Sequence, residues 1–192
     1  MEHLIGILIG VSLAASCGFR VFVPMFVLSV AGITGVLPLD EGWQWMGEWP
    51  AVIAFGVATG CEIAAYYIPW FDNALDTLAT PSAVIAGSVA AAAVMTDLPP
   101  LVQWSVAILA GGGAAGGVQT GTVLLRGAST ALTGGLANFL VATFELVIAF
   151  VLAILAIIAP IFAALALGLI AFLIIRRLLR RPPEKKLEPG KG

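Results

Sequence analysis

The sequence has few charged residues, and those few are unevenly placed. Only 10% of its 192 residues are Asp, Glu, Lys or Arg, whereas a soluble domain carries about 25%. So little charge cannot cover a water-exposed surface, and the composition therefore indicates a bilayer as the surrounding solvent. The net charge of −2 offers no basic surface for nucleic acid. Arg20 and Arg126 are the only Lys or Arg residues before Arg176, and the other seven lie from Arg176 to Lys191.

Cysteine and histidine are equally scarce. Cys17 and Cys61 lie in apolar segments, where they are typical of packing residues rather than of a disulfide framework. His3 is the single histidine, and it cannot form a metal cluster or a catalytic triad by itself. The glycine-rich run 111–117 lacks a following Lys and Ser or Thr, so it favours helix packing over phosphate binding. We therefore expect no enzyme activity, no cofactor and no metal.

Apolar sequence is what the chain has in quantity, and it predicts an all-α polytopic protein with six membrane segments. A spanning helix needs about 20 residues. Residues 4–35 are too long for one straight crossing, and Gly18 and Pro24 predict a kink or break between them. Either a long tilted helix or a helix plus a half-helix fits this length. The other predicted segments are 51–70, 82–95, 101–125, 139–158 and 161–175.

The order of these segments suggests one transmembrane domain, residues 1–181, made of two repeats. Repeat one covers about 4–96 and repeat two about 101–180, with the turn at Pro99 and Pro100 between them. The stretch VATGCE ending at Glu62 resembles VATFE ending at Glu145 if one residue is skipped. Three-segment repeats have opposite orientations, an arrangement found in many transporters. Residues 182–192 are polar and Pro-rich and predict a disordered cytoplasmic tail.

The distribution of charge predicts the orientation in the membrane. The basic cluster that begins at Arg176 belongs in the cytoplasm by the positive-inside rule, and an even number of crossings brings the N terminus there too. Residues 36–50 hold three Trp among carboxylates without Lys or Arg, so we expect this segment on the outer face.

Two polar passages interrupt the apolar sequence, at residues 71–81 and 126–138. We expect both to be non-helical or half-helical, buried in protein, and facing each other or a small aqueous cavity. Asp72 and Asp76 are four residues apart and share a face if this stretch is helical, where Asp72 suits either ion binding or an N-cap. The remaining polar side chains either line a permeation path or only hydrogen-bond neighbouring carbonyls; they are Asn73, Thr77, Ser129, Thr130, Thr133 and Asn138.

Glu62 and Glu145 are the leading candidates for a functional site. A carboxylate at bilayer depth is costly unless it is protonated, paired or facing water. The two residues fit either a proton or cation site or structural ion pairs, such as Glu62 with Arg20. Arg20 itself suits either a counter-ion or a contact to a phosphate or carboxylate. Arg126 is a further candidate for the site, although we interpret its side chain as one that snorkels to the inner headgroups.

Three motifs together resemble a family of small bacterial inner-membrane proteins that carries only a domain-of-unknown-function label. They are residues 18–24 (GFRVFVP), 72–81 (DNALDTLATP) and 126–138 (RGASTALTGGLAN). The resemblance covers about residues 14–180 and implies a bacterial integral membrane protein, but no activity. Phe139 departs from the Pro expected after Asn138, which leaves the entry into the fifth helix undetermined.

These observations predict a small transporter or channel-like protein that moves an ion or small polar solute. Glu62 and Glu145 would be coupling or ion-binding groups, and Arg20 a counter-ion or anion contact. One alternative is a non-transporting accessory or scaffold subunit of a larger membrane complex, and another is a protein that handles lipid phosphates at Arg20. We expect the lipid bilayer as a partner, self-association through small-residue helix faces, and no nucleic acid.

Overall fold

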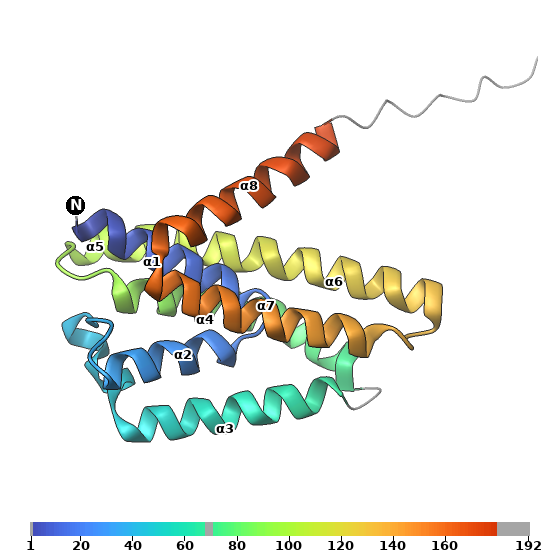
Figure 1. The fold of residues 1–192 in the computed structure, drawn as a ribbon, viewed down its shortest axis with the longest axis horizontal. Helices are drawn as coiled ribbons and strands as arrows, with labels where there is room; N and C mark the ends of the chain where they lie inside the picture. Colours follow the sequence, from blue (N-terminus) through green and yellow to red (C-terminus); the bar gives the residue numbers. More distant parts are fainter. Residues whose placement is uncertain (1, 68–70, 180–192) are drawn as a thin grey trace, which may run out of the picture.

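The computed structural model describes residues 2–67 and 71–179, except for the side chains of residues 2, 71–77, 174–175 and 177–179. Within these ranges the chain is helical and has no β-strand, as the sequence predicts (Figure 1). The predicted tail 182–192 lies outside the described residues. The elements are α1 (Glu2–Cys17), α2 (Phe22–Ile33), the 3₁₀ helix η1 (Glu41–Gly47), α3 (Trp49–Tyr66), α4 (Phe71–Val94), α5 (Pro100–Val106), the π-helical η2 (Ala107–Gly112), α6 (Gly113–Thr133), α7 (Asn138–Ile158) and α8 (Pro160–Leu179).

The long apolar segment 4–35 is divided into α1 and α2 by a four-residue break. The break begins with a tight turn in which the Gly18 amide donates to the Ala15 carbonyl at 3.1 Å and the Arg20 amide donates to the Ser16 carbonyl at 3.2 Å. Pro24 lies in the first turn of α2, where its missing N–H removes no helical hydrogen bond. The predicted break between Gly18 and Pro24 is therefore confirmed.

After this break the chain turns back, so that α1 and α2 form a helical hairpin (Figure 1). A Cβ atom at Gly6, near the start of α1, would lie 3.0 Å from the Val94 carbonyl oxygen. The Asp40 amide, just before η1, donates to the neighbouring Ala93 carbonyl at 2.9 Å. The start of α1 and the Trp-rich segment thus lie at the same end of the bundle. The prediction that they lie on opposite sides is wrong, because it assumed that residues 4–35 cross the membrane once.

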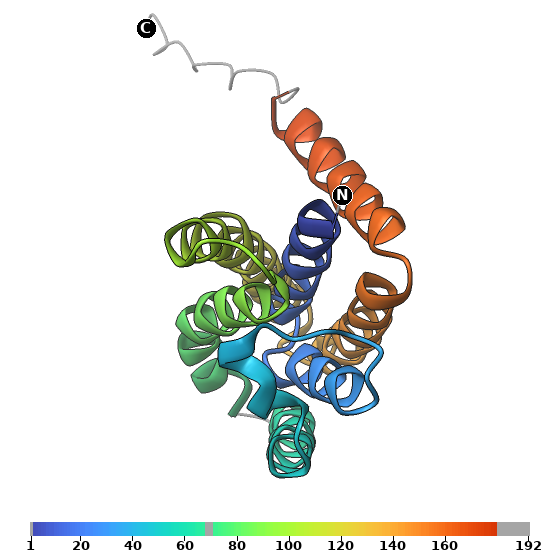
Figure 2. The same cartoon turned by 90° about the vertical axis from the view of Figure 1, so that its left-hand side faces the viewer.

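α1 is the central helix of the bundle. The view along the helices shows α1 among α4, α6, α7 and α8 (Figure 2), and its residues Leu13, Ala14 and Cys17 are fully buried. From Ile9 onwards α1 is almost entirely buried, and a helix buried on all sides has no face for charged residues.

Small residues set the spacing between α4 and the continuous stretch formed by the π-helical η2 and α6. A Cβ atom at Gly87 on α4 would lie 2.6 Å from the Ala115 Cβ, and one at Gly111 would lie 2.7 Å from the Ala91 Cβ. These helices approach so closely that any larger residue would overlap its neighbour. The interpretation of the run 111–117 as helix packing is confirmed at Gly111, whereas Gly113 and Gly117 have no neighbouring atom within 4 Å.

Both polar passages are largely helical, which corrects the sequence-based prediction. Residues 71–81 form the start of α4, and Pro81 lies inside that helix. Residues 126–133 continue α6, which ends at Gly134 in the left-handed conformation with φ +63°. A helix satisfies its own backbone hydrogen bonds, which is the safest solution at membrane depth even for a polar stretch. The non-helical part is the short turn between α6 and α7.

Within the residues that the structure describes, three helical stretches are long and apolar enough to cross a membrane. They are Trp49–Tyr66, Pro100–Thr133 and Asn138–Ile158. Shorter apolar helices cover His3–Cys17, Phe22–Ile33, Leu78–Val94 and Pro160–Leu173. Their outer faces expose large apolar side chains, for example Leu109, Leu132 and Phe162. An apolar surface of this kind suits lipid rather than water.

Candidate functional site

The break between α1 and α2 lies next to a carboxylate from α3. Glu62 Oε1 accepts a hydrogen bond from the Val21 amide at 2.8 Å, and its Oε2 accepts one from the Phe22 amide at 3.0 Å. The first amides of a helix have no partner within the helix, and the helix dipole favours negative charge there. Because α2 has no side-chain cap from its own Val21, the partly buried Glu62 serves as its anionic cap.

Arg20, the residue just before this cap, directs its guanidinium group into the bundle. Its Nη2 donates to the Ala142 carbonyl of α7 at 2.8 Å and lies 3.7 Å from Glu145 Oε2. The guanidinium carbon lies 3.7 Å from the centre of the Tyr66 ring, in a cation–π arrangement. Arg20 is not paired with Glu62 among the described residues, because the carboxylate faces the α2 amides instead.

Two donor groups of Arg20 have no hydrogen-bond partner among the described residues. They are Nε and Nη1, and the residue is only 2% exposed. A buried donor left without an acceptor costs about 1–3 kcal/mol, and more when it is charged. The arrangement therefore leaves the Arg20 guanidinium with unused capacity to bind an acceptor.

Arg126 on α6 joins the same cluster from another side. Its Nε donates to Glu145 Oε1 at 3.2 Å and its Nη2 donates to Glu145 Oε2, forming a two-point pair. The Arg126 guanidinium carbon also lies 4.2 Å from the centre of the Tyr66 ring. At 3% exposed, Arg126 is buried within the bundle, so the interpretation that it snorkels to the headgroups is wrong.

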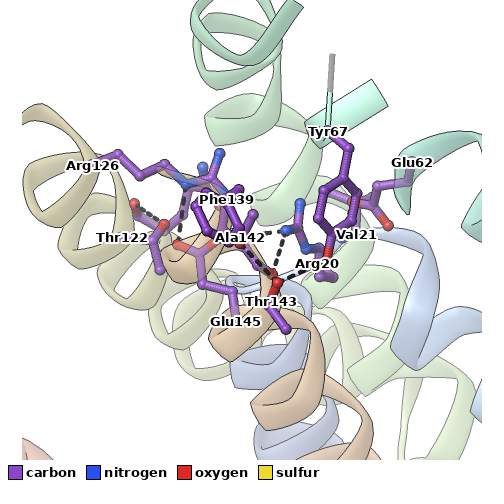
Figure 3. Close-up of polar contacts among 11 residues, drawn as sticks. Arg20, Val21, Glu62, Tyr67, Thr122, Arg126, Phe139, Ala142, Thr143 and Glu145 are labelled. Carbon is purple, nitrogen blue, oxygen red and sulfur yellow. Dashed lines mark hydrogen bonds and ion pairs between the residues drawn. The ribbon is translucent and has the colours of Figure 1, made fainter. Parts of the chain in front are cut away.

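The cluster thus consists of Arg20, Tyr66, Arg126 and Glu145, with Glu62 beside it. Glu62 and Tyr66 are four residues apart on α3 and Ala142 and Glu145 three apart on α7, so each pair shares a helix face. Figure 3 shows Arg20 between the two glutamates, with Glu62 to one side and Glu145 to the other. The two carboxylates therefore have different tasks: one caps a helix, and the other offsets two guanidinium charges.

Sequence reasoning missed two contributors to this region. Tyr66 was recognisable only by its position four residues after Glu62. Thr143 has no such signal, yet its Oγ1 lies 2.8 Å from the Tyr67 hydroxyl and donates to the Phe139 carbonyl at 2.7 Å. Aromatic and Thr side chains are common in membrane helices, so their types alone do not mark a site.

The other predicted site residues are placed elsewhere or lie outside the described part. Near the turn between α6 and α7, Thr133 Oγ1 donates to the Ser129 carbonyl at 2.7 Å, and Asn138 Nδ2 donates to Thr130 Oγ1 at 3.0 Å. The first contact lies within α6 and the second connects the end of α6 to the start of α7. A lining role for these residues stays a prediction. Four predicted residues belong to α4 with side chains outside the described part: Asp72, Asn73, Asp76 and Thr77.

Residues 7–180 match the protein family described as Domain of unknown function (DUF4126). No curated protein and no solved structure matches the chain significantly. The match includes α2, α3, α6 and α7 in full, which carry the buried cluster, and covers well over half of the chain. The chain therefore belongs to this family of domains of unknown function.

Proposed function

We propose that this protein is a small membrane transporter or channel-like protein that moves an ion or small polar solute. The observation that carries the proposal is the buried charge cluster at a helix break inside an apolar bundle. Ionisable groups are costly at membrane depth and are typical of substrate or ion pathways. Here they meet where α1 ends and α2 begins, and broken helices of this kind form binding sites in many transporters.

The arrangement of the helices supports two inverted halves within this proposal. In Figure 1, α2, α3 and α4 alternate in direction, and α6, α7 and α8 alternate in the opposite sense. The half with α2 to α4 contributes Glu62, and the half with α6 to α8 contributes Glu145. The six membrane-embedded segments would be the α1–α2 hairpin, α3, α4, the continuous stretch α5–η2–α6, α7 and α8. We propose a bacterial inner membrane as the location, with the basic residues after α8 in the cytoplasm.

The contacts suggest different roles for the two carboxylates. Glu145 is held by two guanidinium groups, at 3.7 Å from Arg20 Nη2 and in a two-point pair with Arg126, which suits a fixed counter-ion. Glu62 is held by main-chain amides at the edge of the cluster and is only partly buried. Glu62 is therefore the better candidate for a group that moves or changes its charge during transport.

Flux into liposomes that contain the purified protein tests this function. Labelled phosphate, acetate, Na⁺ and K⁺ would each be followed with wild-type protein and with Glu62→Gln, with and without Glu145→Gln. We expect the flux of at least one solute to exceed the flux into protein-free liposomes. The rate in Glu62→Gln should be about tenfold lower, because the substitution removes a charge that we propose to take part in transport. Glu48→Gln removes an exposed carboxylate outside the cluster and should leave the rate unchanged. An unaltered rate in the double variant would remove both residues from the mechanism.

The alternative is a non-transporting accessory subunit of a membrane complex. The closed pairing of Glu145 with Arg126 favours it, because such a pair also stabilises a static fold. A partner that co-purifies in fixed proportion, together with no flux of any of the four solutes, would support this alternative over transport.

A further inference from the structure

We infer that Arg20 anchors a binding site for a small oxyanion, a carboxylate or phosphate group. This inference rests on the proposed function and names its substrate class. The Arg20 side chain is 2% exposed, and its Nε and Nη1 groups have no acceptor among the described residues. The bundle thus buries a permanent positive charge whose hydrogen-bonding capacity is only partly used.

The chemistry of the guanidinium group selects the class of ligand. Arginine has five N–H donors in a planar fork, no acceptor, and a charge that persists in proteins. At Arg20, Nη2 already donates to the Ala142 carbonyl. A group with two oxygens can accept from an unused donor and from Nη2 together, which is the two-point geometry of carboxylate and phosphate recognition. A cation would be repelled by Arg20, and it would leave these donors unpaired.

The neighbouring helix end already binds a carboxylate. The amides of Val21 and Phe22 follow Arg20 directly in the chain, and they hold both oxygens of Glu62 at 2.8 and 3.0 Å. Glu62 is thus a carboxylate belonging to the protein at the same break in the helix. Its negative charge would oppose an incoming oxyanion, so neutralising Glu62 should strengthen binding.

Equilibrium binding to the full-length protein in detergent tests the site without requiring transport. Isothermal titration calorimetry would use inorganic phosphate and acetate, with KCl at matched ionic strength as the reference. A separate titration with short-chain phosphatidic acid distinguishes a lipid headgroup from a soluble oxyanion, because both present the same chemistry to Arg20. Binding of phosphate or acetate indicates a soluble ligand, and binding of phosphatidic acid alone indicates a lipid.

Variants at Arg20 and Glu62 should change the affinity in opposite directions. Arg20→Gln removes the charge, and Arg20→Lys keeps it but removes the fork. Both should weaken binding by roughly ten- to hundredfold, the effect of losing charge-assisted hydrogen bonds. Arg176→Gln is the matched control, because it removes the charge of an exposed Arg on α8. This variant should bind the ligands with wild-type affinity. Glu62→Gln should bind several-fold more tightly.

Wild-type affinity in both Arg20 variants, or no binding of any of the three ligands, would overturn the inference. If the Arg20 variants fail to fold, the Glu62→Gln protein decides: tighter binding supports the site and unchanged affinity overturns it. The inference and the proposed function can fail separately. Oxyanion binding without flux of any solute would remove transport alone, whereas flux of Na⁺ or K⁺ without oxyanion binding would remove the oxyanion site alone.

Discussion

Glu145 on α7 accepts two hydrogen bonds from Arg126 on α6, from Nε to Oε1 at 3.2 Å and from Nη2 to Oε2. Both side chains are about 4% exposed. Two fully buried charges cost a large desolvation energy, which their attraction repays only when the geometry is good. The pair therefore holds two consecutive helices in one register, and Glu145 has Arg20 as a second basic neighbour, with Nη2 at 3.7 Å from Oε2.

The Arg126–Glu145 pair should show strong coupling in a double-mutant cycle. Glu145→Gln is expected to destabilise the protein by about 1.5–3 kcal/mol, because it weakens the charge-assisted hydrogen bonds that Arg126 donates to Glu145. Combining it with Arg126→Gln should cost less than the sum of the two single changes. Thermal unfolding in detergent measures all four proteins, with Glu48→Gln as an exposed control. Additive losses would contradict the pairing.

Gly18, in the break between α1 and α2, has no room for a side chain. A Cβ atom there would lie 2.5 Å from the Ala115 carbonyl oxygen and 2.6 Å from the Val118 Cβ. Gly18→Ala should therefore destabilise the protein by about 1–3 kcal/mol, the usual cost of overpacking. Gly168→Ala on α8 is the matched control, since no atom of the described residues lies within 4 Å of that position, and alanine should be neutral or stabilising in a helix. Equal unfolding temperatures for the two variants would show that the break is not tightly packed.

Gln103 on α5 connects the start of the second half to the end of α4. Its Nε2 donates to the Ala92 carbonyl at 3.0 Å and to the Met95 carbonyl at 3.1 Å, and the residue is 6% exposed. Gln103→Leu keeps the volume but leaves two carbonyls without this donor, so we expect a loss of about 1–3 kcal/mol. Ser105→Ala, on the exposed face of the same helix, should change the unfolding temperature little. A similar small change in Gln103→Leu would indicate that water replaces the amide.

The sequence predicted the helix break well because local chemistry determines it. Gly18 is a poor helix former and Pro24 suits the first turn of a helix, and both preferences depend on residue type alone. The direction of the chain after the break was not predictable in this way. A tilted continuation and a tight reversal fit the same apolar sequence, and the choice depends on contacts with distant residues, such as Glu62 on α3, which caps α2.

The sequence identified the charged residues of the cluster as candidates, but it did not show which of them contact each other. Glu62, Glu145, Arg20 and Arg126 all stood out because charge is rare in apolar segments. Their partners depend on which helices meet, and Arg126 lies 19 residues from Glu145 while Arg20 lies 122 residues from Ala142. The main-chain acceptors and amides that complete the site exist at every residue, so no sequence pattern identifies them.

α6 carries a row of glycines that the fold leaves uncovered. Gly113, Gly117 and Gly121 are spaced four residues apart, so they share one face. Among the described residues, no neighbouring atom would lie within 4 Å of a Cβ atom at any of them. Glycines at this spacing let two membrane helices approach closely and associate through van der Waals contact. Gly111, two residues before Gly113, packs inside the bundle instead. We therefore expect a second copy of the chain to contact the row of Gly113, Gly117 and Gly121.

Self-association through this row should be sensitive to the size of Gly117. Gly117→Leu fills the centre of the row, and we expect it to lower the dimer fraction about tenfold, a step of about 1.4 kcal/mol in association energy. Energy transfer between labelled copies in liposomes, measured over a range of protein-to-lipid ratios, reports that fraction. Gly168→Leu places the same side chain at an isolated open glycine on α8, and it should leave association unchanged. Of the two substitutions, only Gly117→Leu changes the glycine row. Equal dimer fractions in the two variants would therefore place any self-association on another helix face.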